Sequence, residues 1–183
     1  FLLPALAKAK DKSRQISCSG KVRQLGTAVT MYTNDFNSLM PGAFGPNGNK
    51  ADISAPATIF PYLGIPSNAP TNQIIICPAS DKAATETVSL GYNYYLHYQK
   101  ITAVKRPSAT VGYADTRTNY YGDFGKRLDS AEEEWVKTGI RHLGRANYNM
   151  LDNHSESLKP ADILMTAAGS PYSNFQKWYF PYQ

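Results

Sequence analysis

The first 35 residues constrain the fold most, because they carry one continuous helical pattern. Between Leu3 and Asp35, proline occurs only at Pro4 and glycine only at Gly20 and Gly26. Apolar residues recur at spacings of three and four, at Ile16 or Cys18 and then at Val22, Leu25, Val29, Tyr32 and Phe36. A single apolar stripe of this kind predicts an amphipathic α-helix.

The predicted helix is longer than the body against which it would pack. Roughly thirty residues that each rise 1.5 Å give a rod of about 50 Å. A compact domain of 183 residues has a diameter of about 40 Å. Because the apolar stripe begins only near Ile16, we expect the C-terminal half of the helix to be buried and the N-terminal half to protrude.

The charge of the chain is concentrated in the same segment. The formal net charge is +5, and residues 1–23 hold six basic residues and one acidic residue. The remaining residues hold equal numbers of basic and acidic groups. Lysines on one side of a helix are typical of a solvated helix face. A nucleic-acid site would add aromatic or arginine contacts to bases, and no such recognition motif accompanies these lysines.

The rest of the chain predicts a small antiparallel sheet. Apolar residues make up 42% and charged residues 18% of the sequence, which excludes a disordered chain. We expect strands at 109–114, 146–151 and 155–158, a looser strand within 90–98, short helices at 57–63 and 160–168, and a helix at 129–142. The fold class is therefore α+β, a long N-terminal helix packed on a small antiparallel sheet. We expect a stalk helix at 1–36 and a globular head domain at 37–183.

The N-terminal segment resembles a known family. The resemblance rests on the run from Leu2 to Lys10 (LLPALAKAK), on Arg14 and Ser17-Cys18, and on the run from Lys21 to Gly26 (KVRQLG). In these residues the segment is similar to type IV pilin-like proteins, specifically the type II secretion pseudopilins with a prepilin-type cleavage and methylation signal. The resemblance implies a preceding apolar helix that spans the bacterial inner membrane, as a single pass of about twenty residues. That part would be missing from this chain, which has no such apolar stretch.

The resemblance also implies a function and partners. A prepilin peptidase would process the full-length precursor, and the subunit would then assemble with other pseudopilins and with inner-membrane components of the secretion system. The head would lie in the periplasm or on a cell-surface fibre. We expect a structural protein that is not an enzyme and that needs no cofactor or metal.

A second stretch resembles a C-terminal signature of one pseudopilin subfamily, the prepilin-type processing-associated motif. His142 is followed by nine residues and then by Asp152, with Asn147 between them. Asn153 stands where the signature has glycine, and asparagine tolerates a positive φ better than other residues with a side chain. The resemblance implies a structural role for His142, Asn147 and Asp152.

The two cysteines, Cys18 and Cys77, lie far apart in the sequence. In a reducing compartment we expect two buried thiols. In an oxidising compartment a disulfide would close a loop of about 60 residues and contribute roughly 4 kcal/mol in the chain-entropy interpretation. Because a Cys-Pro pair after the helix cysteine recurs in the pseudopilins, the resemblance favours a Cys18–Cys77 disulfide.

Two alternatives from other functional classes stay open. His142, Asp152 and His154 have the residue types of a zinc site or a general base, which would make the chain a secreted metal-dependent hydrolase. The structural interpretation is that His142 bridges a strand pair and that Asp152 accepts its N–H, with Asp115 as a further member of the cluster. The other alternative is a pilin that binds DNA through Lys8, Lys10 and Lys12.

Overall fold

The structure is a computed structural model. It describes residues 3–42, 58–66, 73–80, 89–93, 96, 98–115, 123–124 and 141–159, and the account below is confined to them. Two of the expected helices lie outside the described residues. Of the helix expected at 129–142, only Arg141 and His142 are described, and none of the residues 160–168 is.

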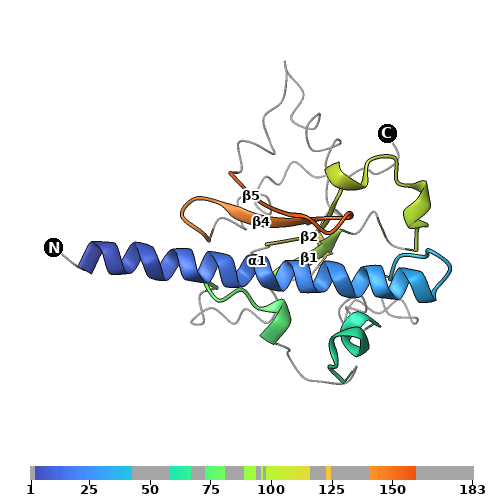
Figure 1. The fold of residues 1–183 in the computed structure, drawn as a ribbon, viewed down its shortest axis with the longest axis horizontal. Helices are drawn as coiled ribbons and strands as arrows, with labels where there is room; N and C mark the ends of the chain where they lie inside the picture. Colours follow the sequence, from blue (N-terminus) through green and yellow to red (C-terminus); the bar gives the residue numbers. More distant parts are fainter. Residues whose placement is uncertain are drawn as a thin grey trace, which may run out of the picture.

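Helix α1 spans Leu3–Asp35, and its N-terminal and C-terminal parts differ in burial. Residues 3–10 are all exposed, whereas the first buried position is Gln15. Figure 1 shows the N-terminal part of α1 extending beyond the strands of the sheet. The expected helix with a protruding N-terminal half is therefore confirmed. Among the described residues, no helix combines the length and apolar character that crossing a membrane requires.

The apolar stripe of α1 differs at its ends from the sequence prediction. Cys18 is fully buried and begins the stripe, while Ile16 is 63% exposed. At the other end, Phe36 is 48% exposed and stacks on Tyr32, with 4.3 Å between ring centroids. Ile16 lies two residues from Cys18, which places it on a different side of the helix and leaves it in solvent.

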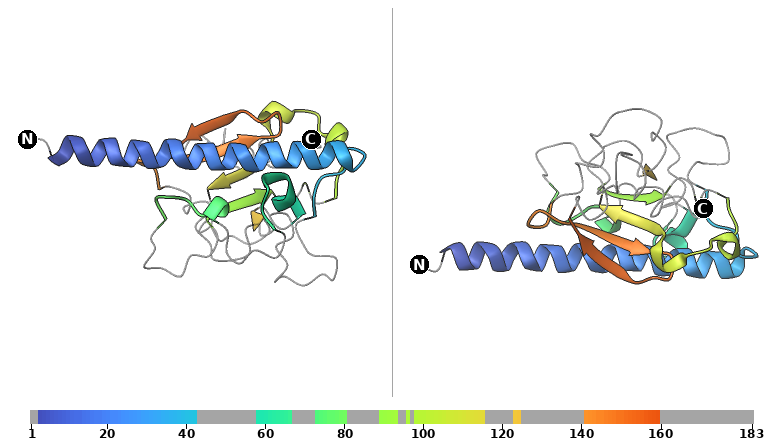
Figure 2. Two further views of the ribbon diagram at one scale, coloured as in Figure 1. Left: turned by 60° about the horizontal axis from the view of Figure 1, so that its bottom comes forward. Right: turned by 90° about the horizontal axis from the view of Figure 1, so that it is seen from above.

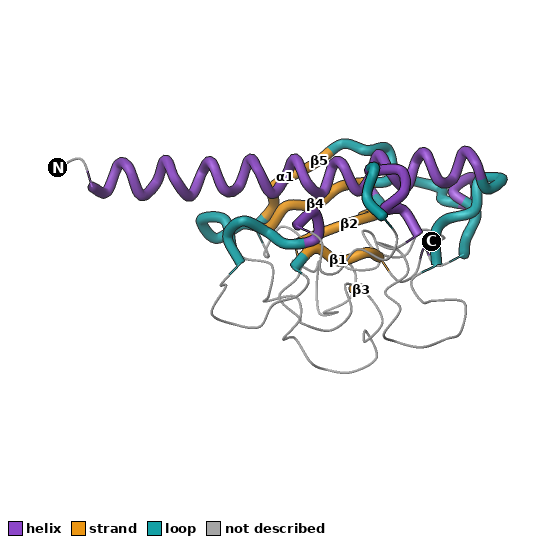
Figure 3. The backbone as a smooth tube through the Cα atoms, turned by 90° about the horizontal axis from the view of Figure 1, so that it is seen from below, coloured by secondary structure: helices purple, strands orange, loops and turns teal. Residues whose placement is uncertain are grey.

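The sheet contains five strands in the order β3-β1-β2-β4-β5. Their bounds are Leu90–Asn93 for β1, Val111–Asp115 for β2, Asp123–Phe124 for β3, Ala146–Met150 for β4 and Ser155–Leu158 for β5. Strands β1, β2, β4 and β5 pair antiparallel, and the two-residue β3 adds in parallel to β1. Figure 3 shows the same order, with β4 and β5 nearest to α1 and β3 farthest from it. The predicted α+β class is confirmed.

Helix α1 lies along one face of the sheet, against β2, β4 and β5 (Figure 2). Every residue of β1, β2 and β4 is buried, whereas β5 is half-buried throughout, as an edge strand is. In the part of the chain that the structure describes, short 3₁₀ helices at Phe60–Leu63, Gln73–Ile75, Ile101–Ala103 and Pro107–Ala109 accompany this core. Since the C-terminal part of α1 shares its core with the sheet, the division into a stalk at 1–36 and a head at 37–183 stays a prediction.

Candidate functional site

Four side chains from four separate segments meet beneath α1. Cys18 lies on α1, Cys77 follows the 3₁₀ helix Gln73–Ile75, Asp115 ends β2, and His142 precedes β4. One ligand atom from each lies within 4.8 Å of every other, and this is the one such group of histidine, cysteine and acidic residues in the described part of the chain. Exposure is 0% for Cys18 and His142, 1% for Cys77 and 5% for Asp115. We call this group the Cys–His–Asp cluster.

The carboxylate of Asp115 is the central acceptor of the cluster. The Cys18 thiol donates to Oδ1 of Asp115 at 2.9 Å, and the backbone N–H of Asn147 donates to Oδ2 at 2.7 Å. His142 Nε2 lies 3.3 Å from the same Oδ2 and 3.2 Å from Cys77 Sγ. Satisfied hydrogen bonds are what make a buried acidic group tolerable.

A tight turn presents His142 to the cluster. His142 and Arg145 exchange both backbone hydrogen bonds, each of 3.1 Å. The two central residues have positive φ, 55° at Leu143 and 79° at Gly144, which is the pattern of a type I′ turn. Glycine adopts this conformation at no steric cost, whereas Leu143 adopts it with strain.

A second turn positions Cys77. Its backbone N–H donates to Ser89 Oγ, and its carbonyl accepts from the backbone N–H of Ser80 at 2.9 Å. The backbone N–H of Ala79 donates to the sulfur itself at 3.4 Å. Because a thiolate accepts hydrogen bonds more strongly than a thiol, this turn favours the charged form of Cys77.

The cluster shifts the pKa values of the two cysteines in opposite directions. The side-chain contact with Cys18 lowers the pKa of Cys77 most, burial opposes this, and the contact with His142 lowers the pKa further, to about 6. The same contact between the two cysteines, together with burial and the charge of Asp115, raises the pKa of Cys18. Burial alone lowers the pKa of His142, but its contacts with Asp115 and Cys77 outweigh burial and raise the pKa to about 9. Cys77 and His142 are therefore disposed to form a thiolate–imidazolium pair.

The cluster differs from a cysteine-protease arrangement in two respects. Cys77 and Asp115 both contact Nε2 of His142, whereas a catalytic triad places the nucleophile and the orienting acid on opposite ring nitrogens. Nδ1 of His142 is buried with no hydrogen-bond partner in the described part of the protein. The sulfur is also enclosed, which prevents contact with a substrate in this conformation.

Comparison with known proteins places the chain in a family. A family model described as "Protein of unknown function (DUF1559)", with the short name SBP_bac_10, matches residues 7–164. The chain belongs to the DUF1559 family. This family is associated with pilin-like, prepilin-type proteins. No curated protein and no solved structure matches the chain significantly.

The motif residues of this DUF1559 protein lie in two different places. Asn147 is fully buried beside the cluster, and its side-chain amide donates to the Gln15 carbonyl of α1 at 3.3 Å. Asp152 lies instead in the β4–β5 turn, where its Oδ1 contacts Nδ1 of His154 at 2.5 Å. The prediction that Asp152 accepts the N–H of His142 is therefore wrong, because the strand carries the two residues to different surroundings. Asn153 has a φ of 68°, as expected for a residue that replaces glycine.

The exposed turn forms its own small group. Nε2 of His154 contacts Glu156 at 3.0 Å, while its Nδ1 contacts Asp152. Partial burial lowers the pKa of His154, but the hydrogen bonds to Glu156 and Asp152 outweigh it, so that the pKa is raised. The hydrolase set of His142, Asp152 and His154 is thus divided between an enclosed cluster and an exposed turn.

The predicted disulfide residues are brought together. Cys18 and Cys77 both belong to the Cys–His–Asp cluster, and both are free thiols in this structure. Pairing of the two stays a prediction. The expected grouping of Asp115 with His142 is confirmed. That the two cysteines lie at the same place as this pair was not predicted from the sequence.

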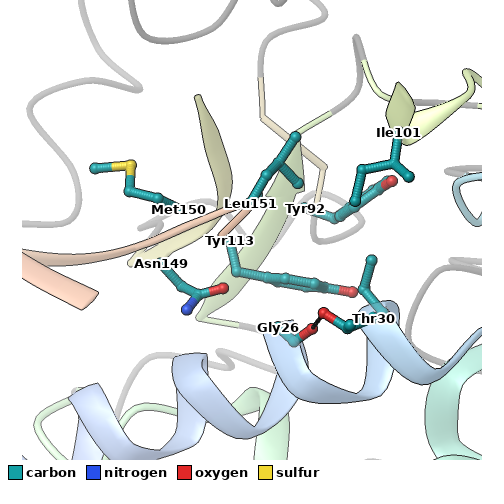
Figure 4. A pocket seen from close by; sticks show the side chains of 10 residues that line it. Gly26, Thr30, Tyr92, Ile101, Tyr113, Asn149, Met150 and Leu151 are labelled. Carbon is teal, nitrogen blue, oxygen red and sulfur yellow. Dashed lines mark hydrogen bonds between the residues drawn. The ribbon is translucent and has the colours of Figure 1, made fainter. Parts of the chain in front are cut away.

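A cavity elsewhere on this DUF1559 protein is too small for an organic ligand. It lies between α1 and the sheet, where Figure 4 shows the ring of Tyr113 above Gly26 and Thr30. Its volume is about 10 Å³, which is room for one water molecule at most. Pockets that bind drug-sized molecules are on the order of 300–1,000 Å³.

Proposed function

We propose that this DUF1559 protein is a structural, non-catalytic subunit of a type II secretion or type IV pilus-like fibre. The observation that carries the proposal is the two-part burial of α1, with residues 3–10 exposed and the stretch from Cys18 to Thr33 packed on the sheet. A long helix with one half packed and one half projecting has the shape that a fibre subunit needs. The association of the family with pilin-like proteins supports the same function.

The projecting part of α1 carries apolar side chains that water does not favour. Leu3 is 80% and Leu6 is 67% exposed. Burial of one leucine side chain contributes about 1.5–3 kcal/mol, so packing against copies of the same helix would stabilise an assembly. In this proposal the precursor is anchored in the inner membrane by its N-terminal helix, processed by a prepilin peptidase, and assembled with the head in the periplasm.

Assembly of the full-length protein tests the proposal. We expect Leu6→Asp to prevent incorporation into high-molecular-weight fibres, because a buried charge in the helical core of a fibre is costly. Leu143→Asp is the matched control, since Leu143 is 57% exposed on the head. Incorporation is measured by fractionation and immunogold electron microscopy. Equal incorporation of both variants, or of neither, would contradict the proposal.

The hydrolase alternative receives less support from the geometry. The three residues it requires, His142, Asp152 and His154, do not form one group, since His142 contacts Asp115 and Cys77 while Asp152 contacts His154. The DNA-binding alternative rests on Lys8 and Lys10, which are exposed, and on Lys12, which donates to Gln15 at 3.0 Å. Salt-sensitive DNA binding that is lost when the three lysines are neutralised would favour it.

A further inference from the structure

We propose that the Cys–His–Asp cluster binds one Zn²⁺ ion, with Cys18 Sγ, Cys77 Sγ, His142 Nε2 and an oxygen of Asp115 as the four ligands. The metal would be structural, and it would fasten α1 to β2, to the segment before β4 and to the turn at Cys77. The site joins the packed part of α1 to the sheet and its loops, and the proposal is independent of whether the protein forms fibres.

The donor set is one that zinc prefers. Zn²⁺ is bound in proteins by cysteine sulfur, histidine nitrogen and carboxylate oxygen, and structural sites are four-coordinate, tetrahedral and closed to solvent. The cluster offers two sulfurs, one nitrogen and one carboxylate, all at most 5% exposed. Hard cations such as Mg²⁺ and Ca²⁺ require a shell of oxygens, which this cluster does not provide.

The spacing of the ligand atoms fits a tetrahedron after a small movement. Zinc–ligand bonds of about 2.0–2.3 Å place neighbouring ligand atoms about 3.3–3.8 Å apart. The separations are 2.9 Å from Cys18 Sγ to Asp115 Oδ1 and 3.2 Å from Cys77 Sγ to His142 Nε2, and one ligand atom from each of the four residues lies within 4.8 Å of every other. Zinc binding therefore requires the closest pairs to separate by a few tenths of an ångström and the wider pairs to approach, while the thiol proton of Cys18 and the Nε2 proton of His142 leave to solvent.

Neighbouring backbone groups already hold the ligands in place. The N–H of Ala79 donates to Cys77 Sγ at 3.4 Å, and the N–H of Asn147 donates to Asp115 Oδ2 at 2.7 Å. Hydrogen bonds of this kind orient metal ligands and tune their basicity. The Asn147 contact engages one carboxylate oxygen and leaves Oδ1 of Asp115, which now accepts from the Cys18 thiol, to reach the metal.

Charge balance is compatible with a divalent cation. Two thiolates and one carboxylate carry three negative charges, which Zn²⁺ reduces to one. Lys21 lies one helical turn after Cys18, and its Nζ donates to the carbonyl of Ile76, the neighbour of Cys77, at 2.8 Å. This ammonium group places positive charge beside the cluster.

A disulfide accounts for fewer of these observations. It would use the two sulfurs alone, whereas two further ionisable side chains, Asp115 and His142, converge on the same point and are almost fully buried. Asp115 and His142 pair with each other, which makes their burial tolerable, but this pairing does not explain why both sulfurs lie at the same point. Zinc accounts for all four residues together. A disulfide and a two-thiolate zinc site exclude each other, which makes the proposal testable.

Metal content of the purified full chain is the first test. We expect native mass spectrometry and elemental analysis to find one Zn²⁺ per chain and no Cys18–Cys77 disulfide. Both thiols should resist alkylation until a chelator and a denaturant are added. A native protein that contains the disulfide, or a reduced protein that takes up no Zn²⁺ when Zn²⁺ is supplied, would overturn the proposal.

Cobalt substitution identifies the ligands without any variant. Co²⁺ in the place of Zn²⁺ should give the intense visible absorption of a tetrahedral site, together with a thiolate-to-metal charge-transfer band. Loss of that band, with Co²⁺ bound in octahedral form, would contradict cysteine ligation. This readout does not depend on whether a mutated protein folds.

Matched variants assign the site to the cluster. We expect Cys18→Ser to weaken Zn²⁺ binding by more than the roughly 10–100-fold that loss of an outer hydrogen bond costs. His154→Gln is the control, since His154 also lies between carboxylates, those of Asp152 and Glu156, but on the exposed turn. His154→Gln should retain the full zinc content. Loss of zinc from His154→Gln and retention in Cys18→Ser would overturn the assignment.

Discussion

Gly26 of α1 lies directly against the side chain of Asn149 on β4. A Cβ atom placed on Gly26 would overlap the amide oxygen of Asn149 and would lie 2.6 Å from Oδ1 of Asn153. Asn149 is 1% exposed, and its amide nitrogen donates to the carbonyl of His154 at 3.3 Å. The absence of a side chain at Gly26 therefore allows the β4–β5 hairpin to approach the helix.

Substitution at this contact should weaken the fold. Gly26→Ala gains helix propensity, but the added methyl displaces a buried, hydrogen-bonded asparagine, so we expect the free energy of unfolding to fall by about 1–3 kcal/mol. Gly20→Ala is the matched control, because Gly20 is an exposed position of the same helix with no atom within 4 Å of the added Cβ. There we expect a rise of about 0.5–1 kcal/mol. Urea unfolding followed by circular dichroism measures both, and an equal effect at the two glycines would contradict the packing described.

Asp115 and Asp152 should differ in their contribution to stability. The Asp115 carboxylate is buried and contacts three hydrogen-bonding groups, and Asp115→Asn replaces it by an amide. We therefore expect the free energy of unfolding to fall by roughly 2–4 kcal/mol. Asp152→Asn alters an exposed pair and should change stability by less than about 1 kcal/mol. Denaturant unfolding of the reduced protein in the presence of chelator checks this without a contribution from metal. A larger loss for Asp152→Asn would show that the cluster is assigned to the wrong aspartate.

His154 should titrate above the usual histidine range. Because its pKa is raised by Glu156 and Asp152, its contribution to stability is fully present below its unfolded pKa of about 6.5 and is lost as the pH rises through the raised value. NMR titration of the histidine ring protons measures the pKa directly. We expect Asp152→Asn to lower it and Asp11→Asn, on the projecting part of α1, to leave it unchanged. A His154 pKa that does not respond to Asp152→Asn would contradict the contact.

Leu143 holds a strained position that another residue would fill better. Its φ is 55° and its side chain is 57% exposed, so replacement costs little packing. We expect Leu143→Asn to raise the free energy of unfolding by up to about 1 kcal/mol, because asparagine adopts the left-handed region more readily. Gly144→Ala, at a φ of 79°, should lower it by about 1–2 kcal/mol. Thermal unfolding compares the two variants, and stabilisation by Gly144→Ala would contradict a type I′ turn.

The sequence predicted the helix and the central strands because each carries a strong local pattern. The stripe from Val22 to Tyr32 determines both the presence of α1 and its buried face. Two short runs with a turn between them, expected at 146–151 and 155–158, predicted the β4–β5 hairpin, which the structure has at Ala146–Met150 and Ser155–Leu158. The two-residue β3 was not predicted, because Asp123 and Phe124 are too few for a periodic signal.

The Cys–His–Asp cluster could not be assembled from sequence spacing. Cys18 and His142 come from segments that only tertiary packing brings together, and no local pattern records their proximity. The interval between His142 and Asp152 suggested a direct contact, but five of the residues between them form β4, which separates the two side chains. Sequence distance across an extended strand is thus a poor guide to contact, since each residue of a strand advances the chain by about 3.3 Å.

The most direct test of the central claim, that the projecting part of α1 packs against other subunits, is photo-crosslinking in the cells that make the protein. A photoreactive residue is placed at position 6 of the full-length protein, and a second variant carries it at position 143 on the head. We predict ladders of crosslinked subunits from position 6, because Leu6 is exposed in the isolated subunit and would be buried in the assembly. Crosslinking of position 6 to segments of its own head, or no subunit ladder from that position, would contradict the account.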